Sequence, residues 1–216
     1  MTILEQALQS PMLPKLAQQL ADVVEAERSR REAFFDDLRE DQKAEFINGE
    51  VFVHSPARYA HCFASESLYL LMATFNAVHR LGDVGHEKRL IHLTRNDYEP
   101  DICFWNQKTA STFTPDQMRF PPPDFIAEVL SPTTEAHDRG IKLEDYAAHA
   151  VAEYWIVDPD ARTIEQYLLR GQAYEQTLKA HDGTIESVAI PGFRIPVQAL
   201  FNPDIRARTM AELVPR

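Results

Sequence analysis

The sequence predicts an α/β protein with a central mixed β-sheet flanked by helices and with an extra N-terminal helix. Hydrophobic residues recur at helical spacing in two long stretches, and short apolar runs bounded by turn residues follow them. One strand–helix–strand succession in the second half is typical of a parallel pair with a crossover. With 216 residues, 44% of them hydrophobic, the chain can bury one good core. We expect a helical extension over residues 1–33 and one domain over residues 34–216.

The first elements are helices and a hairpin. Residues from about Pro14 to Glu40 show helical spacing of apolar side chains. The charge-dense middle, Glu25 to Glu32, indicates either a solvated face or a break between two helices. Asn48-Gly49 lies between two apolar stretches and predicts a tight β-hairpin over residues 45–53. The apolar positions of the helical segment are Leu16, Leu20, Val23, Val24, Phe34, Phe35 and Leu38.

A second long helix opens after Ser55-Pro56, since proline suits the first turn of a helix. Gly82 is the expected C-terminal stop of this helix. Its apolar residues recur at three- and four-residue spacing and predict one buried stripe. The stripe consists of Leu68, Leu71, Met72, Phe75 and Val78.

Strands dominate the rest of the chain. We expect them at residues 89–94, 100–105, 125–130, 153–158 and 163–169, with turns at Asn96-Asp97 and Arg170-Gly171. Ser131-Pro132 has the chemistry that begins a helical segment, and a helix is expected from near Asp138 to Ala150. The strands before and after that helix should therefore run parallel. The C-terminal part is expected to be β-rich, with a corner at Pro191-Gly192.

Composition excludes several classes of protein. No apolar run approaches the ~20 residues that span a bilayer, and no signal-peptide hydrophobic region stands at the N-terminus. The only cysteines, Cys62 and Cys103, do not have the spacing of a zinc site or a disulfide scaffold. We expect a cytoplasmic protein without membrane contact.

Charge alone argues against a nucleic-acid partner, because 22 basic and 33 acidic residues give a net charge of −11. Net charge, however, concerns solubility and association rather than the site itself. The segment between His79 and Arg95 is locally basic. It either meets phosphate or is a solvated strand with its loops. Its cationic and imidazole side chains are His79, Arg80, His86, Lys88, Arg89, His92 and Arg95.

Two carboxylates interrupt apolar strands. Asp101 follows Pro100 at the start of an Ile-Cys-Phe-Trp run, and Glu128 stands inside Phe-Ile-Ala-Glu-Val-Leu. A carboxylate inside a buried strand is costly unless it is paired, hydrogen-bonded or bound to a metal. Hard divalent cations prefer carboxylate oxygen, so two such acids on pairing strands suggest a metal site. Each acid taken alone is also typical of a solvated strand end or a local hydrogen-bond acceptor.

An ordered set of motifs from about Phe34 to Phe201 resembles the Uma-two (Uma2) family, a bacterial group of restriction endonucleases in the PD-(D/E)XK superfamily. None of the motifs is decisive alone, but their order is specific. The resemblance implies a restriction-endonuclease-like core that cuts DNA with Mg²⁺ or Mn²⁺. The residues that carry it are Glu45-Phe-Ile-Asn-Gly49, His61, Pro100-Asp101, Glu128-Val-Leu-Ser131-Pro132, Asp138, Lys142, Tyr146 and Glu153-Tyr-Trp-Ile-Val-Asp158-Pro159.

By this resemblance Asp101 and Glu128 are the metal-binding acids. The superfamily places a lysine two positions after the second acid, and Leu130 occupies that position here. Lys142 is the expected substitute, because Asp138, Lys142 and Tyr146 share one helix face at four-residue spacing. Lys142 as a surface partner of Asp138 is the competing interpretation.

Two further residues complete the predicted site. Glu45 resembles the family's early acid and completes the metal shell or is a solvated strand-edge residue. His61 contacts phosphate or relays a proton, or has a structural role near the start of its helix.

Three functions remain open at this point. The leading hypothesis is a metal-dependent deoxyribonuclease acting as a homodimer, since two symmetric sites suit the cutting of two strands. The first alternative is a catalytically silent nucleic-acid-binding or regulatory module with the same fold, which Leu130 and the net charge favour. The second makes the two acids a glycosidase pair, although only Trp105 offers a nearby aromatic platform.

Overall fold

The computed structural model describes residues 2–39 and 41–214. These residues form two compact units. Unit 1 contains residues 2–54 with 94–97, and unit 2 contains residues 55–93 with 98–214. The domain boundary expected after residue 33 falls inside the long helix α2 (Leu13–Asp36) of unit 1. Glu40, the expected end of the first helical segment, lies outside the described residues.

Unit 1 contains a helical segment and the predicted hairpin. A short helix α1 (Ile3–Leu8) precedes α2, and the strands β1 (Ala44–Ile47) and β2 (Glu50–Val53) pair antiparallel. Asn48 and Gly49 link them with φ angles of 51° and 87°. Both angles are positive, as a two-residue turn between twisted strands requires, so the hairpin prediction is confirmed.

The charged middle of α2 is neither a break nor a fully solvated face, because the helix continues through it. Glu27 accepts hydrogen bonds from Arg95 at 2.7 and 2.8 Å. Arg31 donates to both carboxylate oxygens of Asp97 at 2.6 and 2.7 Å. Glu27 and Arg31 are buried, whereas the apolar side chains nearer the start of α2 are exposed. Hydrophobicity alone predicts that the apolar side chains of α2 are buried and the charged ones exposed. In this helix the ion-paired residues Glu27 and Arg31 are buried instead.

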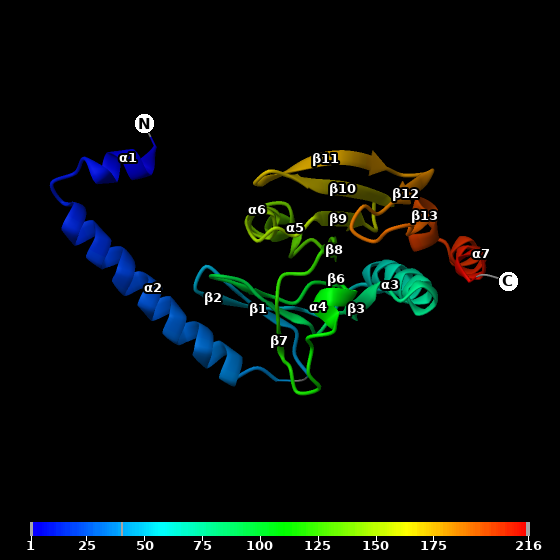
Figure 1. Ribbon diagram of the computed structural model, residues 1–216, viewed down its shortest axis with the longest axis horizontal. Coiled ribbons are helices and arrows are strands. Elements are labelled where there is room, and N and C mark those ends of the chain that lie inside the picture. Colours follow the sequence, from blue (N-terminus) through cyan, green and yellow to red (C-terminus); the bar gives the residue numbers. More distant parts are fainter. Residues whose placement is uncertain (1, 40, 215–216) are drawn as a thin grey trace. The chain divides into compact units, whose positions relative to one another are not determined.

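Unit 2 is built around a six-stranded sheet in the order β11-β10-β9-β8-β6-β3 (Figure 1). Strands β8 and β9 run parallel, as the strand–helix–strand pattern predicted, and the other neighbours run antiparallel. The sheet is therefore mixed, in agreement with the predicted fold class. Its strands are β3 (Gly82–His86), β6 (Ile102–Asn106), β8 (Phe125–Val129), β9 (Glu153–Asp158), β10 (Thr163–Arg170) and β11 (Ala173–Ala180).

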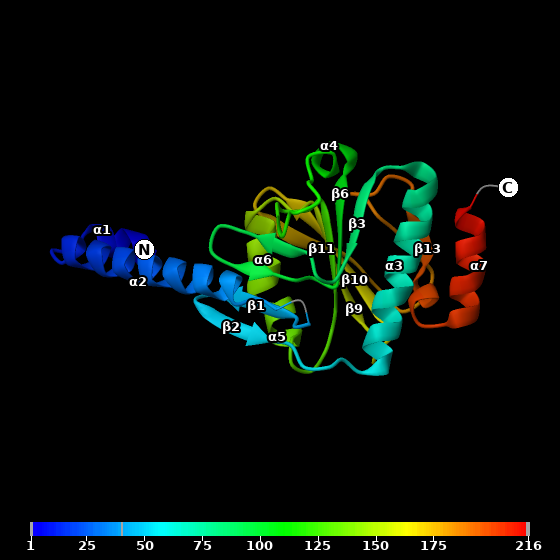
Figure 2. The same ribbon diagram turned by 90° about the horizontal axis from the view of Figure 1, so that it is seen from below.

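Helices cover both faces of this sheet. Figure 2 shows α3 (Tyr59–His79) and α7 (Pro203–Leu213) on one face, and α5 (Glu135–Asp138) and α6 (Ile141–Ala148) on the other. The helices α5 and α6 form the crossover between β8 and β9. The remaining elements are β4 (Leu90–His92), β5 (Asp97–Tyr98), α4 (Gln107–Ala110), β7 (Arg119–Phe120), β12 (Thr184–Glu186), β13 (Arg194–Pro196) and the 3₁₀ helix η1 (Val197–Leu200).

Several boundaries differ from the predictions. The helix α3 ends at His79, and its C-cap Arg80 adopts the left-handed conformation with φ of 52°. Gly82 begins β3 instead of stopping the helix. A Cβ at Gly82 would lie 1.8 Å from the carbonyl oxygen of Trp105, so glycine is needed for strand pairing there. Asp97 lies in a strand rather than a turn. Val78 is 36% exposed, whereas the other four residues of its predicted stripe are buried. The C-terminal part was expected to be β-rich, and this is wrong for its end, where η1 and α7 form helices over Val197–Leu200 and Pro203–Leu213.

The hydrophobic core of unit 2 lies on the face of the sheet that α3 covers. Ile102 and Phe104 of β6, together with Phe125 and Ala127 of β8, pack with α3 in one buried cluster. Successive side chains of a strand point to opposite faces. Glu128, between Ala127 and Val129, therefore points to the face that α5 and α6 cover.

Candidate active site

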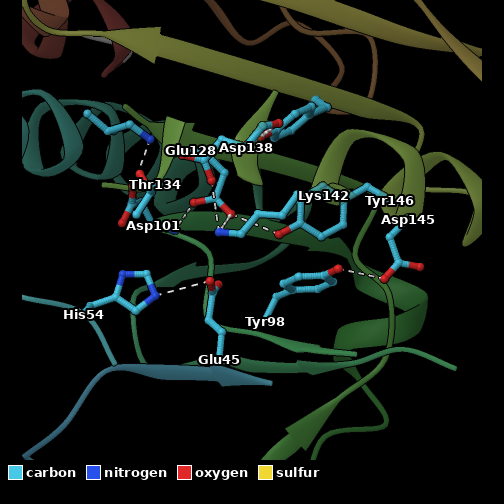
Figure 3. Close-up of polar contacts among 12 residues, drawn as sticks. Glu45, His54, Tyr98, Asp101, Glu128, Thr134, Asp138, Lys142, Asp145 and Tyr146 are labelled. Atoms are coloured by element: carbon cyan, nitrogen blue, oxygen red, sulfur yellow. Dashed lines mark hydrogen bonds and ion pairs between the residues drawn. The ribbon is translucent and has the colours of Figure 1, made fainter. Parts of the chain in front are cut away.

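Glu128 is the centre of a buried polar cluster on the α6 face of the sheet (Figure 3). The residue is 2% exposed. Its Oε1 accepts hydrogen bonds from Nζ of Lys142 at 3.0 Å and from the hydroxyl of Tyr146 at 2.9 Å. Its Oε2 accepts a longer bond, 3.3 Å, from the backbone N–H of Asp101. Three donors from two elements thus hold the carboxylate in one orientation.

Asp101 lies directly before β6, and β6 and β8 are neighbouring strands. Its Oδ2 accepts a 2.8 Å hydrogen bond from the backbone N–H of Val129. Each acid therefore accepts a bond from the backbone of the other strand, which fixes both carboxylates against the sheet. The second carboxylate oxygen of Asp101, Oδ1, lies 3.6 Å from Nε2 of His61 on α3. Within unit 2, the structure thus brings Asp101, Glu128 and His61 of the predicted site together with Lys142.

Lys142 is buried, with a side chain only 2% exposed. Its ammonium lies 3.1 Å from Oδ1 of Asp138 as well as 3.0 Å from Glu128, and 5.8 Å from the ring centre of Tyr98. The pairing with Asp138 is therefore present, but it is a buried contact of the site rather than a surface one. Leu130, at the usual lysine position, is 5% exposed. A cation bonded to Glu128 therefore comes from the crossover helix α6 rather than from β8.

Aromatic residues that the sequence analysis did not place in the site surround this cluster. The hydroxyl of Tyr98 donates to Asp145 at 2.9 Å, and the Tyr98 ring meets the edge of Tyr146. The hydroxyl of Tyr154 donates to the carbonyl oxygen of Asp138 at 3.0 Å. Burial, with the carboxylates of Asp138 and Glu128, raises the pKa of Tyr154, so this hydroxyl stays a neutral donor. Tyr98 and Asp145 are 47 residues apart in sequence, and no local pattern links them.

Glu45 lies in unit 1, on β1, and is 1% exposed. Within that unit its Oε2 is 3.2 Å from Nε2 of His54. Glu45 is therefore a buried residue and not a solvated strand edge. Its assignment to the metal shell stays a prediction.

The unit 2 cluster brings three buried carboxylates close to the ammonium of Lys142. Asp101, Glu128 and Asp138 are each at most 3% exposed, and three carboxylates with the one ammonium of Lys142 sum to −2 while His61 is neutral. Buried carboxylates stay ionised only when cations or hydrogen bonds compensate them. Protonated His61 would supply one positive charge, and a divalent ion would supply two.

The donor set fits a hydrated divalent ion. Among residues 2–39 and 41–214, no group of three or more His, Cys, Asp or Glu side chains is arranged to hold a metal by itself. Magnesium, however, is usually held through one or two carboxylates while it keeps several waters and binds substrate phosphate. An ionised carboxylate has about four lone-pair sites, so it can accept hydrogen bonds and still ligate an ion. These two acids are the residues that would hold such an ion.

The basic segment between His79 and Arg95 is partly neutralised by acids. Lys88 lies 3.8 Å from Glu99, and Arg89 lies 3.5 Å from Asp83. Arg89 also stacks over the ring of Phe120 at 4.9 Å. The segment is therefore not a continuous free basic surface in unit 2.

Comparison with known proteins identifies the family. The model of the Uma2 family, described as "Putative restriction endonuclease", matches residues 15–198. The chain belongs to the Uma2 family. The match begins inside α2, upstream of the start near Phe34 that the motifs suggested, so the long N-terminal helix is part of the family region.

A solved structure shows the same fold. The crystal structure of a "putative nuclease belonging to DUF820" from Anabaena variabilis is similar with a TM-score of 0.65 and 17% identity, covering 78% of this chain and 94% of that one. The predicted fold class is thereby confirmed: a central mixed sheet flanked by helices, with the N-terminal helix present as α2. No curated protein matches the sequence. No helix in the described part of the chain is long and apolar enough to cross a membrane.

Proposed function

We propose that this Uma2 protein is a divalent-metal-dependent endonuclease that hydrolyses phosphodiester bonds in DNA. One observation carries the proposal: a buried lysine of the crossover helix places its ammonium 3.0 Å from Glu128, which is hydrogen-bonded to the backbone of Asp101. The cluster thus combines two acids with a cation although the strand position itself holds leucine. The family match and the nuclease-like fold support a reaction on nucleic acid.

In this proposal Asp101 and Glu128 hold Mg²⁺ or Mn²⁺. Such an ion, when bound, neutralises non-bridging phosphate oxygens and lowers the pKa of a water molecule. The chain's own contribution is orientation. The hydroxyl of Tyr146 and the backbone N–H groups of Asp101 and Val129 fix the two carboxylates before substrate arrives.

Lys142 supplies positive charge to the phosphate as negative charge develops in the transition state. Its position is fixed by Glu128 and Asp138, so little reorganisation is needed during the reaction. His61, beside Asp101, is placed to hold or transfer a proton near the acids. A DNA substrate and two free cysteines suit action in the cytoplasm.

The alternative is a catalytically silent nucleic-acid-binding or regulatory module. Two observations favour it: the Lys142 ammonium is already engaged with two carboxylates, and the chain carries a net charge of −11. Under this alternative the buried cluster stabilises the fold and binds no metal.

A plasmid assay distinguishes the two. Supercoiled DNA is incubated with Mg²⁺ or Mn²⁺ and with the parent protein, Glu128→Gln or Glu165→Gln. Glu165 is a matched control, because it is a buried acid of the same sheet. Its partners Arg139, Tyr167 and Lys179 lie outside the site. We expect metal-dependent cleavage by the parent and by Glu165→Gln, and none by Glu128→Gln. A parent that binds DNA but leaves it intact with either metal would establish the silent module.

A further inference from the structure

The N-terminal helices of unit 1 expose an unusual amount of apolar surface. Sixteen large hydrophobic residues are exposed in the described part of the chain, and eight of them fall within the first 24 residues. In α1 they are Ile3, Leu4 and Leu8, with exposed fractions of 86%, 67% and 59%. Apolar surface concentrated in this way on a soluble chain is typical of an interaction site.

The spacing along α2 is that of a coiled coil. Leu13, Leu16, Leu20 and Val23 follow one another at intervals of three, four and three residues, as the a and d positions of a heptad do. The positions that flank this row are uncharged: Ala17, Gln19, Val24 and Ala26. A second helix can therefore approach closely along the row.

In its C-terminal part, the same heptad row is packed against partners inside unit 1. Its next position is Glu27, whose carboxylate is bonded to Arg95, and a further heptad on Phe34 packs against the ring of Phe46 at 5.8 Å. Nearer the N-terminus, Leu20 is 67% exposed and Val23 is 52% exposed. The same face of α2 is thus packed inside unit 1 near its C-terminal end and exposed near its N-terminal end.

We propose that this open surface, the N-terminal seam formed by the apolar side chains of residues 3–24, pairs with the same seam of a second copy of the chain. A heptad row is self-complementary, and a two-fold axis brings identical rows together. The eight exposed side chains present on the order of 800 Å² of surface, which is about what a standard interface covers on each partner.

The charge pattern favours a protein partner over a lipid surface. Between Thr2 and Val24 the charged residues are Glu5, Lys15 and Asp22, which sum to −1. Helices that lie on membranes carry polar faces rich in lysine and arginine, because they are attracted to anionic lipids. A nearly neutral seam in a chain of net charge −11 has no such attraction.

Light scattering coupled to gel filtration tests the seam without reference to any activity. The double variant Leu16→Glu/Leu20→Glu places charges in the row, and Leu70→Glu is the matched control, because Leu70 on α3 is as exposed as Leu16, at 38%. We expect dimers at micromolar concentration for the parent and for Leu70→Glu, and a monomer with unchanged helical circular dichroism for the double variant.

A parent that is monomeric at 100-fold higher concentration overturns the proposal, as does a double variant that remains dimeric. If the glutamates unfold α2, Leu20→Ala/Val23→Ala keeps good helix formers and should still weaken dimerisation at least tenfold. Sedimentation of a monomeric parent with anionic vesicles would instead identify a membrane surface. In the proposed nuclease, a monomeric variant should still nick plasmid and should lose concerted double-strand cutting.

Discussion

Replacing Lys142 by methionine removes the buried ammonium while keeping most of the side-chain stem. A second lysine–glutamate ion pair of the same length serves for comparison. Nζ of Lys179 lies 3.0 Å from Glu165, and Nζ of Lys142 lies 3.0 Å from Glu128. The two side chains differ in exposure, 2% for Lys142 and 58% for Lys179. Lys179→Met is therefore a control that is matched in residue type and bond length.

The expected stability losses differ several-fold. Removing one partner of a buried ion pair costs about 3–5 kcal/mol, because the remaining carboxylates stay buried. An exposed pair contributes about 0.2–1 kcal/mol. For a chain of this size these changes in the free energy of unfolding correspond to a fall in Tm of about 6–20 °C for Lys142→Met and about 4 °C or less for Lys179→Met.

The catalytic effect is measured separately, at a temperature where both variants are folded. Plasmid cleavage at saturating Mn²⁺ should fall on the order of 10²-fold or more for Lys142→Met and stay unchanged for Lys179→Met. Cleavage by Lys142→Met at the parental rate would refute the catalytic assignment. Equal falls in Tm for the two variants would refute the reasoning from burial.

Three further variants probe other contacts. In Asp101→Asn the side-chain oxygen can still accept the backbone bond from Val129, so we expect an intact fold. Calorimetry should show no heat of Mn²⁺ binding for this variant. A heat of binding equal to that of the parent would place the metal elsewhere. Tyr146→Phe removes the 2.9 Å bond to Glu128 and should cost about 1.5–3 kcal/mol in urea unfolding, with slower cleavage; an unchanged midpoint would contradict this. Burial acts to raise the pKa of Glu165, but hydrogen bonds, first from Arg139, outweigh it and lower the pKa to about 2. The free energy of unfolding that this carboxylate contributes should be fully present above pH ~4.5 and lost as pH falls toward 2. The parent should therefore lose more stability than Glu165→Gln when pH is lowered over this range. Equal losses of stability in the two proteins would contradict the pairing.

The sequence predicted those parts of the fold that local patterns specify. Asn48-Gly49 identified the hairpin because few residues adopt positive φ readily, and the crossover between β8 and β9 followed from the order of elements. The position of Lys142 near Glu128 was predictable for the same reason. The helix expected from near Asp138 is divided at Gly140 into α5 and α6, but Lys142 still lies 3.1 Å from Asp138 and shares α6 with Tyr146. The catalytic roles of these residues remain predictions.

The sequence could not reveal features that depend on distant partners. Glu27 and Arg31 sit in a run of charges that is typical of a solvated face, and their partners Arg95 and Asp97 are 68 and 66 residues away. Gly82 is needed because of the carbonyl oxygen of Trp105, which strand pairing alone brings near. The helix α7 lacks a strong apolar period, and packing against α3 and η1 decides its place.

Because Lys142 lies on α6 and not on β8 with Glu128, the cluster can form only at a later stage of folding. In a site whose acid and lysine share one strand, both groups are in place as soon as that strand is extended. Here the acid lies on β8 and the lysine on α6, fourteen residues further along the chain. The cluster therefore exists only after the crossover has docked on the sheet. A partly folded chain with its strands formed and α6 still detached would have Glu128 without its cation, so the complete cluster would appear only when α6 docks on the sheet.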